Sequence, residues 1–240
     1  MIPEQLKSSM LNSTNKKSFA LVTSGKLGAK ENMFIDRELF KGFTADALPS
    51  FRVYEWEPSF TYGVSQKSDS LKNFDDLKVY GDNHAQRMTG GGILFHGNDI
   101  SYSLVIATSY VQGLSVKESF ELIGTFLMEF YRALGLNPIY AKDAQVNLSK
   151  SEYCQKGYEP YDILIGGKKI GGNAQRRTKE AIFQHGSISI DNSVNNMGYS
   201  LEDLGIKIGY EEAKELLVKS FVKSFNIEFK HKDQELPHAS

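Results

Sequence analysis

The sequence is short of cysteine, of long apolar runs and of net charge. Cys154 is the only cysteine among 240 residues, so no disulfide can form within the chain and a reducing compartment is expected. No apolar run approaches the ~18 residues that cross a bilayer, and residues 1–17 lack the apolar core of a signal peptide. The formal net charge of −1 provides no overall field for a nucleic-acid or membrane partner. We therefore expect a cytoplasmic protein, with a monomer as the default.

Composition and length fit a single globular domain. Hydrophobic residues make up 40% and charged residues 24% of the chain, which is ordinary for a folded protein. The length is sufficient to bury a substantial core. We expect a flexible polar segment over residues 1–17, one domain over residues 18–229 and a polar tail over residues 230–240. The sequence has no internal repeat and no convincing linker.

Hydrophobic periodicity and turn residues predict the secondary structure. Strands are expected at 18–25, 51–57, 59–66, 99–107, 161–165 and 181–190, with a hairpin turn at Gly166-Gly167 leading into a further strand. Helices are expected at 29–42, 115–138 and 210–225. The longest helix begins with Ser115 and Glu118 in the spacing of a capping box. Because the elements lack the regular alternation of a doubly wound sheet, their order predicts an α+β fold, with a central mixed or antiparallel β-sheet flanked by helices.

Two glycine-rich stretches stand out against this pattern: residues 87–96 (RMTGGGILFH) and residues 166–177 (GGKKIGGNAQRR). Consecutive glycines let a ligand lie against the backbone, and their N–H groups can form an anion-binding nest. Arg87 adds a planar fork that suits a carboxylate or phosphate. The first stretch lacks the spacing of a P-loop, and a glycine-rich hairpin or bulge is the structural alternative. Two such stretches with cationic residues favour a binding site.

These stretches resemble motifs of the lipoate–protein ligase and octanoyltransferase family. The first is similar to the family's R-x-S/T-G-G-G-x-x-x-H signature and the second to its G-K/R-K-I/V-x-G-x-A-Q/Y-R element. Residues 184–188 (QHGSI) are similar to its H/Q-H-G-S/T-I/L element. The matching elements follow the family's order between residues 18 and 190. The resemblance implies the fold shared with biotin–protein ligases, and attachment of an octanoyl or lipoyl group to one lysine of a small acceptor domain.

The resemblance also implies roles for individual residues. Lys169 matches the lysine at the reacting carbonyl, where an ammonium can stabilise negative charge or a neutral amine can take a proton. His96 would support the glycine loop. The other residues matched to substrate binding are Arg87, Thr89, Gly90, Gly91, Gly92, Gly172, Asn173, Ala174 and His185. One departure is Asn173, which stands where the family usually has serine and is expected to alter the floor of the pocket.

Cys154 bears on which of two chemistries the chain performs. A ligase activates lipoate with ATP, whereas a transferase takes an octanoyl thioester from acyl carrier protein and needs no ATP. Cys154 lies eight residues before Asp162, which resembles the transferase branch whose cysteine carries the acyl group as a thioester. Tyr161 stands where most ligases have an asparagine that helps hold ATP and its metal. The chain also leaves no room for the accessory domain usual in bacterial ligases.

The sequence therefore predicts an octanoyl-acyl carrier protein:protein N-octanoyltransferase. It would pass octanoyl through Cys154 to a lysine of a lipoyl domain or of a glycine-cleavage H-type protein, with no cofactor and no metal. Three alternatives stay open: a short lipoate–protein ligase that uses ATP and Mg, an amidotransferase between lipoyl domains, and a non-catalytic binder of acyl carrier protein or a lipoyl domain. For single residues, Cys154 as a small buried hydrophobe and Lys169 in a solvated turn are the structural alternatives.

Overall fold

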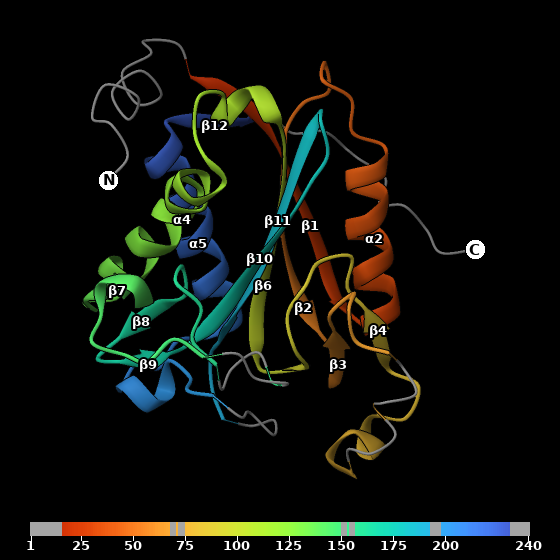
Figure 1. The fold of residues 1–240 in the computed structure, drawn as a ribbon, viewed down its shortest axis with the longest axis vertical. Helices are drawn as coiled ribbons and strands as arrows, with labels where there is room; N and C mark the ends of the chain where they lie inside the picture. Colours follow the sequence, from red (N-terminus) through yellow and green to blue (C-terminus); the bar gives the residue numbers. More distant parts are fainter. Residues whose placement is uncertain are drawn as a thin grey trace.

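A six-stranded mixed β-sheet organises the chain and has helices on both of its faces (Figure 1). The computed structural model describes residues 16–67, 71, 75–149, 153, 157–192 and 198–230. The strands lie in the order β10 (Gly171–Arg177), β11 (Ala181–Ser189), β6 (Asp99–Ala107), β2 (Ser50–Trp56), β1 (Lys17–Leu27) and β12 (Ile227–Lys230). β1 is parallel to β2 and β12, and the remaining pairings are antiparallel. The predicted α+β fold with a mixed sheet is confirmed.

The three long helices bury the two faces of this sheet. Helices α4 (Val116–Ala133) and α5 (Tyr210–Phe225) lie on one face, and α2 (Ala29–Lys41) lies on the other. In the larger core, the Phe51 ring of β2 stacks on the Phe221 ring of α5 with centroids 4.0 Å apart, an aromatic contact that adds to the energy of burial. The predicted capping box at the start of α4 is present, since Ser115 and Glu118 each accept the other's backbone N–H. No helix among the described residues could cross a membrane.

Two small sheets bring the glycine-rich stretches to the main sheet. One contains β4 (His84–Gln86), β3 (Ser59–Tyr62) and β5 (Leu94–His96), and the other contains β7 (Pro138–Tyr140), β8 (Ile163–Ile165) and β9 (Lys168–Lys169). The predicted turn at Gly166-Gly167 is confirmed, because both glycines have positive φ, 58° and 78°, as a two-residue hairpin turn needs.

The strand after this turn is not continuous as predicted, and the chain changes sheets at Ile170. Lys169 ends β9 in the small sheet, and Gly171 begins β10 in the main sheet. Ile170 between them is fully buried in the main core, which fixes the point at which the chain crosses over. Strand β12 was not expected either, because its four residues carry too short a pattern to distinguish from the neighbouring polar sequence.

Candidate active site

A cleft with a volume of about 1150 Å³ brings the two glycine-rich stretches together. The predicted site residues that line it are Arg87, Gly90, Gly91, Gly92, His96, Lys169, Gly172, Asn173, Ala174 and His185. Thr89 lies behind the wall, where its hydroxyl is 2.7 Å from Nε2 of His185. Cys154 lies outside the described residues. Tyr153 and Gly157, which are described and precede and follow it in the sequence, both line the cleft.

The glycine loop owes its shape to Arg87 and to close backbone contacts. Arg87 is buried and donates hydrogen bonds to the carbonyl of Gly92 at 2.6 Å and to the hydroxyl of Thr61 at 2.8 Å. A Cβ atom on Gly63 would lie only 2.0 Å from the carbonyl oxygen of Gly91, and Gly91 has a φ of 105°. These positions therefore need glycine, and the guanidinium holds the loop against β3.

His96 is held behind this loop by contacts on three sides. Its Nε2 is 2.9 Å from the Thr61 hydroxyl and its Nδ1 is 2.8 Å from Oδ2 of Asp99. The ring stacks on Trp56 with centroids 3.7 Å apart. Burial by itself would raise the pKa of Asp99, but His96 and several hydrogen bonds hold that pKa below its usual value. Because Thr61 contacts both His96 and Arg87, the histidine supports the loop through it.

Lys169 lies in the wall of the cleft with its charge paired. Its Nζ is 2.6 Å from Oδ2 of Asp162 and donates to the carbonyl of Gly157 at 3.1 Å. Lys169 is 5% exposed, so the alternative of a solvated turn is wrong for this residue. Burial raises the pKa of Asp162, although the Lys169 ammonium opposes that shift.

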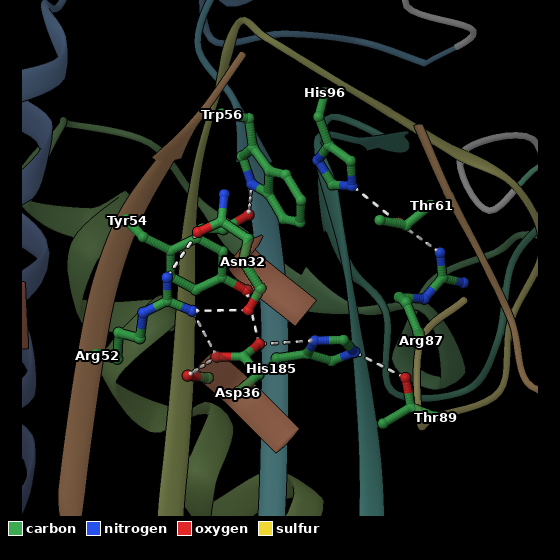
Figure 2. A network of polar contacts seen from close by, with 12 residues as sticks. Asn32, Asp36, Arg52, Tyr54, Trp56, Thr61, Arg87, Thr89, His96 and His185 are labelled. Atoms are coloured by element: carbon green, nitrogen blue, oxygen red, sulfur yellow. Dashed lines mark hydrogen bonds and ion pairs between the residues drawn. The ribbon is translucent and has the colours of Figure 1, made fainter. Parts of the chain in front are cut away.

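A buried polar network links the loop to helix α2, and sequence reasoning did not identify it (Figure 2). Arg52 and Asp36 form a fully buried ion pair, with NH1 2.8 Å from Oδ1, and Arg52 also donates to Oδ1 of Asn32 at 2.6 Å. Nδ1 of His185 lies 3.7 Å from Oδ2 of Asp36, while its Nε2 faces Thr89. Figure 2 shows His185 between the Asp36 carboxylate and Thr89.

The network sets the charge states of its members. Burial by itself would raise the pKa of Asp36, but Arg52 and His185 hold it below its usual value. Burial lowers the pKa of His185 despite the nearby carboxylate. The available sequence signal was an arginine within a strand whose neighbours are apolar. Among the described residues, no group of three or more His, Cys, Asp or Glu side chains is placed to hold a metal ion.

The fold and this cleft are those of a known family of catalytic domains. The chain belongs to the Lipoyl protein ligase A/B catalytic domain family, which matches residues 28–232. This confirms the family that the motifs predicted.

Individual relatives carry the name octanoyltransferase. The chain is 30% identical over 179 residues to Octanoyltransferase LipM of Lysinibacillus sphaericus, covering 71% of this chain and 65% of that protein. It is 29% identical over 217 residues to Octanoyltransferase LipM of Geobacillus kaustophilus, covering 87% and 76%. The match therefore spans slightly less than two thirds of the first relative's length.

Solved structures share the fold at lower identity. Protein Ta0514 from T. acidophilum aligns with a TM-score of 0.72 and 19% identity, covering 90% of this chain and 88% of that one. Lipoate-protein ligase A bound with ATP aligns with a TM-score of 0.70 and 20% identity, with the same coverage. At these identities the likeness establishes the fold.

Proposed function

We propose that this chain is a protein octanoyltransferase of lipoate biosynthesis. It takes octanoyl from acyl carrier protein and transfers it to a lysine of a lipoyl domain or of a glycine-cleavage H-type protein. The observation that carries the proposal is the buried Lys169–Asp162 pair, which holds an ammonium in a cleft beside exposed glycine backbone. The names of the similar LipM proteins support the same activity.

The chemistry needs a cation near the acyl oxygen. When an amine attacks the thioester carbon, a C–N bond forms and negative charge develops on the carbonyl oxygen. The C–S bond then breaks, and the thiol leaves with the proton that the amine loses. A paired ammonium such as that of Lys169 stabilises the oxygen charge in a site of low dielectric. The thioester is already activated, so the reaction proceeds without ATP.

Cys154 gives this reaction a two-step form. Its thiolate attacks the octanoyl thioester and releases the carrier as a thiolate. The acceptor lysine then attacks the new thioester, and the sulfur of Cys154 leaves with the proton that the amine loses. The spacing to Asp162 and the position of Tyr153 and Gly157 in the cleft wall support this relay. Tyr161 also favours the transferase over the ligase, because it stands where most ligases have an asparagine that helps hold ATP and its metal. Its ring stacks on Phe120 of the cleft wall with centroids 5.8 Å apart.

Acyl transfer without ATP tests the proposal. Wild-type protein incubated with octanoyl-acyl carrier protein should gain one octanoyl group by intact mass and pass it to a lipoyl domain. Cys154→Ala should not gain the group. Cys154→Ser keeps nearly the same side-chain size without the thiol, so it tests whether the thiol itself is needed. Transfer that occurs only with ATP and free lipoate would favour the ligase. Transfer that starts only from an octanoylated lipoyl domain would favour the amidotransferase.

A further inference from the structure

A directed row of hydrogen bonds crosses three strands of the main sheet and ends at the cleft. It starts at Arg177 on β10, passes through Gln175 and Gln184 to Tyr102 on β6, and returns to Asn173 on β10. Asn173 lines the cleft. The proposed function gives no role to this residue, which stands where the family usually has serine.

Arg177 fixes the direction of the row. A guanidinium only donates, so the oxygen of Gln175 must face it, at 2.9 Å from NH2 and 3.1 Å from Nε. The amide nitrogen of Gln175 then faces Oε1 of Gln184 at 2.5 Å. The amide nitrogen of Gln184 in turn donates to the Tyr102 hydroxyl at 2.8 Å. Each amide orientation therefore follows from the one before it.

The last bond decides which end of Asn173 faces the cleft. The Tyr102 hydroxyl has accepted a hydrogen bond, so it donates its own proton to Oδ1 of Asn173 at 2.8 Å. Burial raises the pKa of Tyr102, which keeps the phenol protonated for this role. With Oδ1 occupied, the Nδ2 donor has no acceptor among the described residues.

Gly186 makes the contact between Asn173 and Tyr102 possible. In the sheet register Gly186 lies opposite both Asn173 and Tyr102. A Cβ atom on Gly186 would lie 2.1 Å from Oδ1 of Asn173 and 2.7 Å from a Tyr102 ring carbon. A glycine inside a strand commonly marks such a close approach. The two side chains thus meet across a position that has no side chain of its own.

Lys169 packs against the residue that precedes Asn173. Its Cε is 3.8 Å from the position that a Cβ atom on Gly172 would occupy, so the lysine side chain packs on the backbone just before Asn173. Both residues line the cleft. A neutral donor and a cation therefore lie in the wall of one cleft.

We propose that Nδ2 of Asn173 donates a hydrogen bond to the acyl oxygen of the substrate, and that Tyr102 and Gln184 are positioning residues that hold the amide in this orientation. The inference rests on the proposed acyl transfer at this cleft. As the acceptor amine attacks and charge builds on the acyl oxygen, this donor stabilises the charge together with Lys169. It forms no covalent bond and exchanges no proton with the substrate.

Asn173→Asp is the first test, because it keeps the shape and the oxygen that accepts from Tyr102 but replaces the donor. Losing one such donor lowers kcat by about 100-fold, while KM for octanoyl-acyl carrier protein should change little because the bond strengthens in the transition state. Asn173→Leu removes the donor without adding charge and should also lower kcat. Gln112→Glu, an exposed amide outside the cleft, is the matched control and should retain wild-type kcat.

The Tyr102→Phe variant tests the row itself. Without the hydroxyl, the side-chain amide of Asn173 can rotate and exchange its oxygen and nitrogen, so kcat should fall by about 10-fold. Tyr102→Phe added to Asn173→Leu should cause no further fall in kcat. A purely structural role predicts equal effects in both backgrounds. Wild-type kcat in Asn173→Asp, or additive effects in the double variant, would overturn the proposal.

A binding measurement separates this inference from the proposed function. Octanoate presents a carboxylate oxygen in place of the acyl oxygen, and saturating octanoate should shift the side-chain amide resonance that Asn173→Leu lacks. An unshifted resonance would overturn the donor role. If the wild type transfers no octanoyl at all, the proposed function is wrong, and this resonance still decides whether Asn173 binds an acyl oxygen. The same measurement serves if Asn173→Asp or Tyr102→Phe fails to fold.

Discussion

Lys169 and Asp162 form an almost fully buried ion pair, with Nζ and Oδ2 2.6 Å apart in the wall of the cleft. Asp162 also accepts the backbone N–H of Glu159 at 2.8 Å, so the carboxylate is anchored to the segment before β8. The position of the ammonium is thus set by two parts of the chain and not only by the hairpin that carries it. Removing Lys169 would leave the carboxylate of Asp162 buried without an opposite charge beside it.

Lys169→Met should lower the free energy of unfolding at pH 7 by about 3 kcal/mol, since it leaves the buried carboxylate of Asp162 without the ammonium that opposes the rise in its pKa. Urea unfolding at pH 7 measures the change. Lys219→Met, which removes the partner of Glu215 in an exposed pair on α5, is the matched control and should hardly change the free energy of unfolding. Similar small changes in both variants would show that Lys169 is solvated.

Stability should fall as the pH drops below about 6.5, because the pKa of His185 is lowered in the folded protein. The unfolded chain then binds this proton more readily than the folded protein does. The free energy of unfolding therefore falls by up to ~1.4 kcal/mol for each pH unit. The lowered pKa of Asp36 adds a loss of the same sign at more acidic pH. His185→Gln should flatten the dependence between pH 6.5 and 5 in urea unfolding. An unchanged slope in that variant would assign the effect to another group.

Arg52→Met should lower the free energy of unfolding by about 3–5 kcal/mol, because it leaves the carboxylate of Asp36 buried and unpaired. Adding Asp36→Asn should recover part of this loss, which a double-mutant cycle by chemical denaturation measures. Arg37→Met is the control. It changes an exposed arginine on α2, the helix that carries Asp36, and should leave stability unchanged. Additive effects of the two buried changes would contradict a direct pair.

Gly63→Ala should distort the glycine loop, because the new methyl group would meet the carbonyl oxygen of Gly91 at 2.0 Å. We expect a loss of about 2 kcal/mol in stability and a marked loss of acyl transfer, as followed by thermal unfolding and intact mass. Gly25→Ala is the control, since a Cβ atom there would have nothing within 4 Å. Equal behaviour of the two variants would show that the loop accommodates a side chain.

Local signals predicted most of the elements that position the site. The strand at 99–107 and the helix at 210–225 were predicted with the bounds that the structure has, because the first ends in a nearly continuous apolar run and the second has an amphipathic helical pattern. The approach of the two glycine-rich stretches followed from the family resemblance. The pairing of Arg52 with Asp36 could not be predicted, because it depends on how a helix packs on a strand. The meeting of Asn173 and Tyr102 likewise depends on strand register.

The place of β12 has a consequence for how the protein is made. β1 lies between β2 and β12, and Lys17 is opposite Ile227. While a ribosome is still synthesising the chain, β1 can pair with β2 but its other edge waits for residues more than 200 positions later. Such long-range pairing is slow and leaves a strand edge open to other chains. We therefore expect the newly made protein to depend on chaperones until its last strand has emerged.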